Sequence, residues 1–343
     1  MKIVIELNHP KHFYQFKQVM NILIQKGHSI QIVARDKDVL LKILQEEGIN
    51  YQVFGVHKKN LIMKLFAVIY ILISYYKILK KAQPNIIISK ASLYSVFLSK
   101  LLKCKTIIFP DSEVVFVTNK IVAPLADRVI TPENFELNYG VKHIRIPGLF
   151  ENCYLHPSVF QFNNEELNKL NIIKPYVVLR FIGWTANHDV GKKGISEDKK
   201  SEIVNLLKNR FQVYISSEKE LSDNLKEYSL KIPASKIHHV LYGAELYLGD
   251  SQTMATEAAL LGTPSIRTNS FVGEHDMSNF KLLESKYHIL RNVALEGNLF
   301  DVIGELTEPD KKNEWMDKRN NYFSSIGDTN MIIAELIESV CNK

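Results

Sequence analysis

The chain has 343 residues, of which 46% are hydrophobic and 23% charged, and a formal net charge of +6. This length fits two domains of about 150–170 residues, and the composition excludes disorder, collagen and coiled coil as descriptions of the whole chain. The three cysteines, Cys104, Cys153 and Cys341, lie far apart in the sequence. Their spacing excludes a disulfide framework and a cysteine-built zinc site, and it is typical of a protein in a reducing cytosol.

The N-terminal half alternates between strand-like apolar runs and segments with the helical period. Strands are expected at residues 2–7, 29–34, 51–54, 85–89, 106–109 and 128–130. Helices are expected at residues 13–26 and 38–47, each ended by a glycine, and across the apolar stretch at residues 65–76. Strands and helices in alternation predict a parallel sheet with helices on both faces, which is a doubly wound domain.

The pattern lapses at residues 145–157, which predict an interdomain linker, and then restarts. Strands are expected at residues 176–181, 211–216, 237–241, 246–249 and 265–267, and helices at residues 197–208, 251–262 and in the segment 314–343. We therefore expect an N-terminal domain at 1–150 and a second doubly wound domain at 151–320. A C-terminal helix at 321–343 is expected to pack back on the first domain.

Positive charge is concentrated in the N-terminal half, where residues 48–110 contain ten lysines and no aspartate or glutamate. Such a region favours an anionic partner: a phosphorylated substrate, an anionic lipid surface or a nucleic acid. A solvated basic face without a partner is the alternative. The apolar stretch at 65–76 is too short to cross a bilayer, so it predicts either a buried helix or one whose apolar side rests on a membrane. The N-terminus lacks a signal-peptide pattern, so we expect a cytoplasmic location, with peripheral contact at the inner membrane face as an option.

The most informative segment is LGDSQTMATEAALLGTPSIR, at residues 248–267. A strand ends at Gly249, and small polar residues then open a helix whose N-terminus suits a phosphate or pyrophosphate. Ser251 and Thr253 add hydroxyl donors, and Glu257 lies one turn further, where a carboxylate can accept both ribose hydroxyls of a nucleotide. In the alternative interpretation, Asp250 or Ser251 only caps the helix and Glu257 is an exposed helical acid.

This segment resembles the donor-nucleotide motif of GT-B glycosyltransferases and of UDP-N-acetylglucosamine 2-epimerases. The chain resembles the DUF354 family of GT-B-like proteins more closely. The matching stretches are NHPKH (8–12), FPDSE (109–113), APLADRVITPENF (123–135), YLHP (154–157), LRFIGWTANHDVGKKGIS (179–196) and DSQTMATEAALLGTPSIR (250–267). The resemblance implies an α/β protein with the GT-B fold, in which two Rossmann-like domains face a central cleft. The 2-epimerases have a TRPE-type start where this chain has NHPKH, which counts against epimerase activity.

The resemblance also implies roles for individual residues of the second domain. It assigns Ser251, Gln252 and Thr253 to the donor diphosphate and Glu257 to the ribose. Arg180 is expected to neutralise the leaving nucleoside diphosphate, with a structural salt bridge as the alternative. Further donor contacts are expected from Trp184, Asn187 and His188 on a loop with Gly191 and Gly194. Residues 238–243, with Gly243, are expected beside the nucleobase, and Arg267 with residues 273–276 is expected to contact the sugar.

In the N-terminal domain, a base is needed to take the proton of the acceptor hydroxyl. Histidine suits this role because its pKa lies near neutrality. His12 is the first candidate and His9 the second, while Asp111 and Glu113 are the alternative acids. In the simpler interpretation, either histidine only packs or caps the helix.

Together these features predict a glycosyltransferase that moves a sugar from a nucleoside-diphosphate donor, UDP-sugar favoured, to a phosphorylated or lipid-linked acceptor in cell-surface polysaccharide assembly. The alternative is an NDP-sugar 2-epimerase or hydrolase that uses the same donor pocket. The sequence contains no HExxH, GxGxxG or P-loop motif, so no metal and no cofactor is expected. It also has no nucleic-acid-binding motif, and a nucleic-acid partner is not expected.

Overall fold

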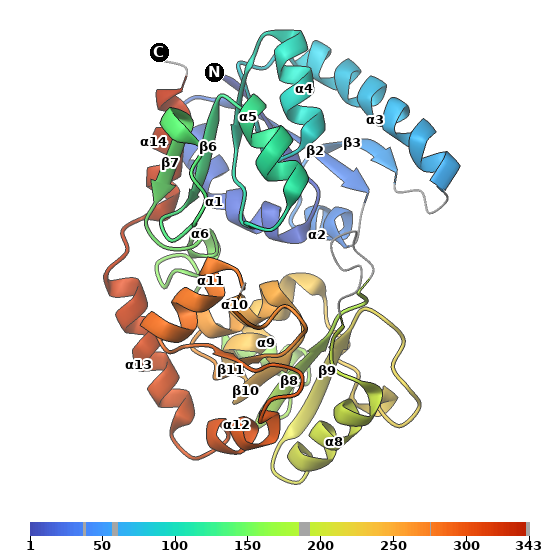
Figure 1. The fold of residues 1–343 in the computed structure, drawn as a ribbon, viewed down its shortest axis with the longest axis vertical. Helices are drawn as coiled ribbons and strands as arrows, with labels where there is room; N and C mark the ends of the chain where they lie inside the picture. Colours follow the sequence, from blue (N-terminus) through green and yellow to red (C-terminus); the bar gives the residue numbers. More distant parts are fainter. Residues whose placement is uncertain (37–38, 57–60, 185–192, 275, 341–343) are drawn as a thin grey trace. The chain divides into compact units, whose positions relative to one another are not determined.

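The computed structural model describes residues 1–36, 39–56, 61–184, 193–274 and 276–340 (Figure 1). The chain divides into two compact units. Unit 1 consists of Met1–Tyr154 together with the C-terminal segment from Ile326, and unit 2 is Leu155–Ser325. The chain therefore returns to its first unit after completing the second.

Unit 1 is built on a seven-stranded parallel sheet with strand order β3-β2-β1-β4-β5-β6-β7. The strands are β1 (Lys2–Leu7), β2 (Ser29–Asp36), β3 (Tyr51–Val56), β4 (Ile86–Ser89), β5 (Lys105–Ile108), β6 (Arg128–Pro132) and β7 (His143–Ile146). The central strands are rich in isoleucine and valine and are buried, as expected for a parallel sheet covered on both faces. The sheet reverses its order between β1 and β4, because β2 and β3 extend it in one direction and β5–β7 in the other.

Helices cover both faces of this sheet (Figure 1). One face carries α3 (Leu61–Ala82), α4 (Leu93–Leu102), the π-helical turn Thr118–Val122 and α5 (Ala123–Leu125). Tyr75 and Leu79 of α3 pack with Val4 of β1 in the core of this face. The other helices are α1 (Pro10–Gln25), α2 (Leu40–Glu46) and the C-terminal α14 (Thr329–Ser339), and α1 packs against both α2 and α14.

Ion pairs and a buried hydrogen bond secure α14 in unit 1. Glu338 pairs with Lys26 (2.6 Å) and His28 (2.8 Å) at the end of α1. The Asn330 side-chain amide donates to the carbonyl of Cys153 (3.0 Å). The side chain of Ile333 is fully buried, so α14 is an integral part of the unit 1 core.

Unit 2 contains a five-stranded parallel sheet with strand order β12-β11-β10-β8-β9. Its strands are β8 (Tyr176–Phe181), β9 (Gln212–Ser217), β10 (Leu246–Gly249), β11 (Ser265–Arg267) and β12 (Arg291–Asn292). Its α-helices are α7 (Asn164–Lys169), α8 (Glu197–Leu207), α9 (Ile237–Gly243), α10 (Gln252–Leu260), α11 (Ser278–Lys281), α12 (Leu299–Leu306) and α13 (Lys311–Ser324). The order of this sheet reverses between β8 and β10.

Two sequence-based expectations about local structure are wrong. Residues 237–241 were expected to form a strand, but they belong to helix α9, which packs against α7 and α10. A short apolar run is compatible with either structure, and here packing against helices selects the helix. The expected linker at 145–157 is also partly regular, since it includes the end of β7 and the short helix α6 (Asn152–Leu155).

The long apolar helix α3 is buried on one side and exposes apolar side chains on another. Ile71, Tyr75 and Leu79 are buried in the core, whereas Ile69 and Ile73 are about half exposed. Within the described residues, none of the helices combines the length and apolar character needed to span a bilayer.

Candidate functional site

Each sheet reverses its strand order at one point, which lies between β1 and β4 in unit 1 and between β8 and β10 in unit 2. In open parallel sheets ligands bind at such switch points, because the neighbouring connections leave toward opposite faces of the sheet. In unit 2 this position is flanked by residues 182–184 after β8 and residues 250–253 after β10. In unit 1 it is flanked by residues 8–12 after β1 and by Lys90 after β4.

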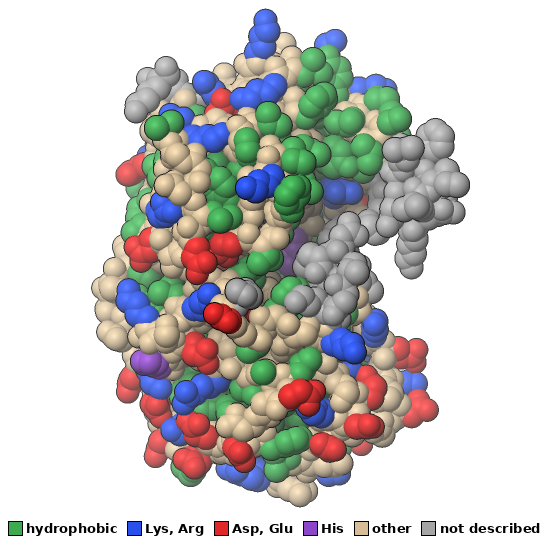
Figure 2. All heavy atoms as spheres, viewed as in Figure 1, with side chains coloured by type: hydrophobic (Ala, Val, Ile, Leu, Met, Phe, Trp, Pro, Cys, Tyr) green, Lys and Arg blue, Asp and Glu red, His purple; other side chains and the backbone are tan. Residues whose placement is uncertain are grey.

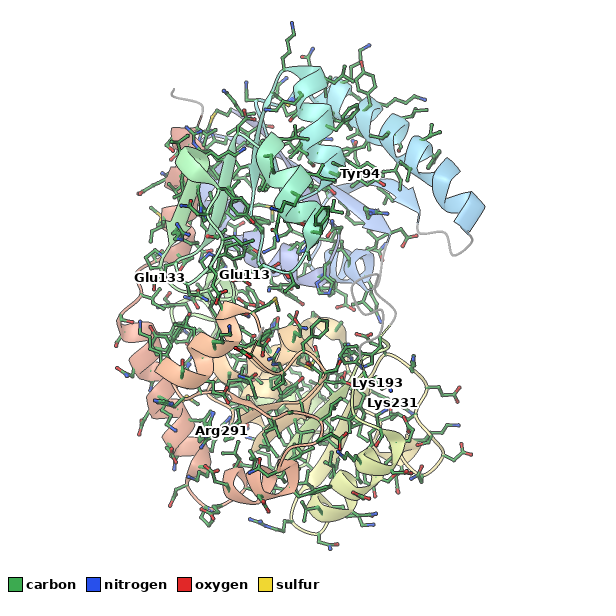
Figure 3. All side chains as sticks on the ribbon, in the orientation of Figure 1. Tyr94, Glu113, Glu133, Lys193, Lys231 and Arg291 are labelled. Carbon is green, nitrogen blue, oxygen red and sulfur yellow. The ribbon has the colours of Figure 1, made fainter. Side chains whose placement is uncertain are left out.

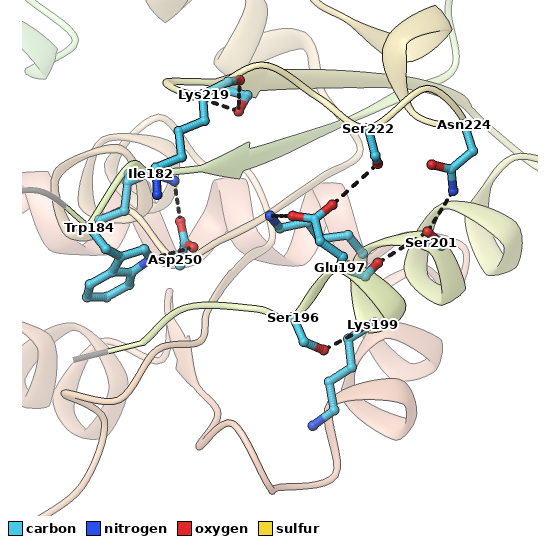
Figure 4. A network of polar contacts seen from close by, with 12 residues as sticks. Ile182, Trp184, Ser196, Glu197, Lys199, Ser201, Lys219, Ser222, Asn224 and Asp250 are labelled. Atoms are coloured by element: carbon cyan, nitrogen blue, oxygen red, sulfur yellow. Dashed lines mark hydrogen bonds and ion pairs between the residues drawn. The ribbon is translucent and has the colours of Figure 1, made fainter. Parts of the chain in front are cut away.

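Asp250 joins the two segments at the unit 2 switch point (Figure 4). Its Oδ1 accepts a hydrogen bond from the Ile182 N–H (2.8 Å), and its Oδ2 accepts one from the Trp184 indole N–H (3.1 Å). Burial raises the pKa of this carboxyl group to about 6, although both hydrogen bonds oppose the shift. Asp250 therefore positions the loop after β8 relative to the start of α10.

Trp184 is held in an unusual backbone conformation at this point. Its φ is +50°, in the left-handed region that costs a non-glycine residue about 1–2 kcal/mol. Its indole stacks at 6.2 Å on the ring of Phe271. A Cβ on Gly194 would lie 2.3 Å from the indole nitrogen and 2.1 Å from Asp250 Oδ2, so close packing requires the glycine. Asn187, His188 and Gly191 of the same predicted loop lie outside the described residues.

Ser251 begins helix α10 at the centre of this site. Its Oγ accepts a hydrogen bond from the Met254 N–H (3.4 Å), so the capping role expected as the simpler alternative is present. Ser251, Gln252 and Thr253 are all partly exposed. The first-turn N–H groups of a helix have no acceptor within the helix, and together with the helix dipole they favour an anion. The partly exposed start of α10 therefore favours an anion over a cation.

Arg180 is the next-to-last residue of β8, and in the sheet it lies opposite Gly249 of β10, which precedes the start of α10. Its Nη1 donates to Ser216 Oγ (2.8 Å), and its Nη2 pairs with Glu218 (2.6 Å). The second carboxylate oxygen of Glu218 accepts from the Gly183 N–H (2.8 Å). The salt bridge considered as an alternative for Arg180 is thus formed. The Arg180 Nε is nevertheless buried without a hydrogen-bond partner among the described residues.

Glu257 is buried on α10, only 6% exposed, rather than on its solvent face. Its carboxylate lies 3.4 Å from His238 Nε2 at the beginning of α9. Gly243 occupies the opposite end of α9, just before β10 begins, and is therefore not brought to the switch point. A Cβ there would meet the hydroxyl of Tyr176 at 2.6 Å, so core packing accounts for this glycine.

Arg267 was expected to contact the sugar, but its side chain is fully buried. It pairs with Asp276, donates from Nε to Asn292 (2.7 Å), and lies 3.5 Å from the ring centre of Phe280. These contacts give Arg267 a structural role in holding the segment around residue 276. Of that predicted loop, residue 275 lies outside the described residues.

At the switch point of unit 1, two histidines begin helix α1. His9 is the N-cap residue, and its Nδ1 accepts from the Lys11 N–H (3.2 Å). His12 Nδ1 accepts from the Asn8 N–H (3.4 Å), and the two imidazole rings lie 5.8 Å apart. Burial lowers the pKa of His12 well below its usual value, and the neighbouring His9 and Lys90 act in the same direction. The His12 imidazole is therefore neutral at neutral pH.

Beside these histidines, four charged side chains form an ion cluster of alternating sign. Lys11 pairs with Asp111 (3.0 Å) and Glu151 (2.8 Å), and Lys90 pairs with the same oxygen of Asp111 (3.1 Å). Burial alone would raise the pKa of Asp111, but the two ammonium groups hold it far below its usual value. Burial lowers the pKa of Lys90 to about 8. The Asp111 carboxylate is therefore ionised and paired with two lysines, and its low pKa makes it a weak base.

Three members of this ion cluster were not among the sequence-based candidates: Lys11, Lys90 and Glu151. Lys11 and Lys90 each follow the end of a central strand, and residues at the ends of adjacent parallel strands share one edge of the sheet. That rule would have selected both lysines.

Glu113, by contrast, was among the sequence-based candidates for the acid or base. Its carboxylate accepts a hydrogen bond from the Glu136 N–H (3.5 Å), and the residue lies on the segment after β5 (Figure 3). The described residues hold no group of three His, Cys, Asp or Glu side chains arranged to bind a metal ion.

With its two parallel sheets of seven and five strands, the chain has a GT-B-like fold. The chain belongs to the family described as "Protein of unknown function (DUF354)", whose model matches residues 1–293. A curated relative, uncharacterized protein MJ0665 of Methanocaldococcus jannaschii, is 24% identical over 281 residues, which cover 78% of this chain and 81% of the relative.

Solved structures of UDP-GlcNAc 2-epimerases and of MurG share this fold. The UDP-GlcNAc 2-epimerase of Methanocaldococcus jannaschii matches with a TM-score of 0.66 and 14% identity, over 99% of this chain and 100% of its own. The UDP-GlcNAc 2-epimerase of Neisseria meningitidis, solved with UDP-GlcNAc bound, has a TM-score of 0.65 and 12% identity with the same coverage. MurG of Acinetobacter baumannii has a TM-score of 0.59 and 12% identity over 99% of this chain and 100% of its own. At these identities the similarity establishes the fold.

Proposed function

We propose that the protein is a GT-B glycosyltransferase that moves a sugar from a nucleoside-diphosphate donor to an acceptor. The observation that carries this proposal is the partly exposed start of α10 beside Arg180, at the switch point of the unit 2 sheet. A UDP-sugar is the favoured donor, because a protein of the same fold was solved with UDP-GlcNAc bound.

In this proposal the donor diphosphate binds at the N-terminus of α10, with Ser251 and Thr253 as hydroxyl donors and Glu257 as the acceptor for the ribose. When the bond between the sugar and the diphosphate breaks, its electron pair leaves with the nucleoside diphosphate. The α10 dipole and the positive charge of the Arg180 guanidinium stabilise the developing charge without a metal. Arg267 supports this site indirectly, through its buried pair with Asp276.

Unit 1 supplies the acceptor side of the reaction, and His12 is the proposed base with His9 as the second candidate. A neutral imidazole can accept the proton of an acceptor hydroxyl, whose oxygen then attacks the anomeric carbon. The Nε2 atom accepts this proton in the tautomer that carries the ring proton on Nδ1, and the Asn8 N–H contact that this tautomer gives up is long, at 3.4 Å, and therefore weak. The acceptor is proposed to be phosphorylated or lipid-linked.

A second candidate function is an NDP-sugar 2-epimerase or hydrolase that uses the same pocket. The specific observation in its favour is the similarity in fold to two UDP-GlcNAc 2-epimerases, with TM-scores of 0.66 and 0.65. Incubation with UDP-GlcNAc in the absence of an acceptor separates the candidates. A released 2-epimer or free sugar supports the second function, and unchanged UDP-GlcNAc supports a transferase.

The first test is a thermal-shift panel of UDP, GDP, CDP and UDP-N-acetylhexosamines on the wild type and on Glu257→Gln. A ligand at about 100 times its Kd stabilises the folded state by about 2.7 kcal/mol. We expect one nucleotide class to raise the Tm of the wild type and to lose most of this effect in the variant.

The matched control for this panel is Glu202→Gln, a change at an exposed glutamate of α8 in the same unit. The ligand-induced shift is compared with each variant's own ligand-free Tm, so that an effect on folding is separated from one on binding. If no nucleotide shifts the wild type, or if both variants respond alike, the assignment of the donor site is wrong.

A further inference from the structure

We infer that unit 1 carries a docking surface for an anionic lipid bilayer, on the side of its sheet covered by α3, α4 and α5. This goes beyond the proposed transferase activity and depends on different residues. The surface, here called the α3–α5 face, consists of exposed apolar side chains with lysines around them.

Exposed apolar side chains are concentrated on this face. Of the twenty large hydrophobic residues that are exposed among the described ones, twelve lie between positions 68 and 125. The most exposed of these twelve, at 50–69% of their full accessible area, are Ile69, Tyr70, Ile73, Phe97, Leu101, Val114 and Phe116. Figure 2 shows hydrophobic side chains gathered over α3, α4 and α5. A large exposed apolar area in a folded protein is typical of an interaction site.

The helices that carry these side chains pack against each other. Tyr75 of α3 and Leu98 of α4 lie in the same core cluster, and Val96 of α4 packs with Val122 and Ala123 at the start of α5. The remaining face of α4 presents Leu93, Phe97 and Leu101 to solvent at a spacing of four residues. Helix α4 is thus apolar on both its core side and its outer side, which an ordinary surface helix is not.

The positive charge around this face favours an anionic lipid bilayer as the partner. Exposed lysines follow the apolar residues along the helices: Lys77, Lys80, Lys81, Lys100, Lys103 and Lys120. Of these, Lys100 pairs with Asp127 (3.0 Å). The segment 48–110 contains no acidic residue at all. Long lysine side chains can lie along an apolar surface while their ammonium groups reach anionic headgroups. An apolar centre with a basic rim is therefore complementary to the interface of an anionic membrane.

The same charge pattern disfavours the other partners that an apolar face can have. If a second copy of the chain docked here, two lysine-rich rims would be brought together with few carboxylates to compensate them. A nucleic acid would pair with the lysines, but it would leave the apolar side chains between them without a partner. The described helices do not span a bilayer, so the contact is lateral and reversible.

The test is co-sedimentation of the full chain with vesicles of phosphatidylglycerol and phosphatidylcholine, compared with phosphatidylcholine alone. We expect binding only to the anionic vesicles, and we expect it to weaken as salt is raised. Replacing three lysines (Lys77→Gln, Lys80→Gln, Lys81→Gln) is expected to weaken partitioning about 10-fold to 100-fold. The pair Phe97→Ser and Leu101→Ser is expected to weaken it about 10-fold or more.

Matched controls come from exposed residues of unit 2. Ile173→Ser with Leu206→Ser controls for lost apolar surface, and Lys208→Gln with Lys219→Gln and Lys231→Gln controls for lost charge. All variants are checked for an unchanged Tm. The inference is overturned if the wild type does not sediment with anionic vesicles, or if control and α3–α5 variants lose binding equally.

Sedimentation velocity without lipid measures the oligomeric state and provides a further test. A dimer that Phe97→Ser and Leu101→Ser dissociates would instead assign this face to a second copy. Because UDP binding is measured without lipid, failure here leaves the donor-site proposal intact.

Discussion

Single residues at the two switch points show how burial changes the chemistry of a side chain. Asp250 and Asp111 are both aspartates that follow a central strand, yet their pKa values move in opposite directions. Burial dominates at Asp250 and raises its pKa to about 6, whereas Lys11 and Lys90 outweigh burial at Asp111 and lower its pKa. Asp250 can therefore change its charge in mildly acidic solution, while Asp111 remains ionised.

The raised pKa of Asp250 predicts a pH-dependent contribution to stability. The folded state binds the Asp250 proton more tightly than the unfolded state, so the free energy of unfolding falls as pH rises from about 4 to about 6. A shift of about two pKa units corresponds to at most about 3 kcal/mol. Asp250→Asn removes this dependence. In urea unfolding at pH 4, 5, 6 and 7, the stability of the wild type minus that of Asp250→Asn is expected to decrease with pH and then to level off. Parallel pH profiles for the two proteins would contradict this assignment.

At the scale of elements, the site in unit 2 depends on how closely β8 and β10 approach. Gly249 ends β10 directly opposite Arg180, and a Cβ at Gly249 would lie 2.5 Å from the Arg180 carbonyl oxygen. A backbone atom cannot move aside as a flexible side chain can. Glycine at 249 therefore permits the close approach of the two strands, and the next residue, Asp250, lies within hydrogen-bonding distance of the Ile182 N–H.

Gly249→Ala is expected to destabilise the protein by about 1–3 kcal/mol, because the two strands must separate to accommodate the methyl group. The matched control is Gly304→Ala in the interior of α12, where a Cβ would meet nothing within 4 Å. This control is expected to stabilise by about 0.5–1 kcal/mol, since alanine loses less entropy on folding. Urea unfolding of both variants provides the measurement. Equal effects of the two changes would exclude the close strand approach as the reason for glycine at 249.

At the scale of the whole molecule, the two ends of the chain fold together. The C-terminal helix α14 packs on α1, and Ile333 and Ile337 are fully buried in unit 1 although unit 2 separates them from the rest of that unit in sequence. Loss of contacts in α14 should therefore destabilise α1, which lies more than 300 positions earlier in the chain, rather than the helices of unit 2 that precede α14 in sequence.

Ile333→Ala with Ile337→Ala is expected to destabilise unit 1 by about 2–5 kcal/mol per substitution. Hydrogen–deuterium exchange should increase in peptides from α1, while peptides from α8 in unit 2 remain protected. Met331→Ala changes a partly exposed residue of the same helix and is expected to have little effect. Increased exchange confined to unit 2 would contradict the assignment of α14 to unit 1.

The alternation of apolar strands and amphipathic helices was sufficient to predict two doubly wound parallel sheets, and small polar residues after a strand identified the start of α10. These features are local, because strand and helix periods and caps are encoded within a few neighbouring residues. The sequence could not show that residues 237–241 form a helix, that Arg267 is buried against Asp276, or that Lys11 and Lys90 share Asp111. Each of these depends on contacts between segments distant in sequence, and tertiary packing decides which partner a charged or apolar side chain meets.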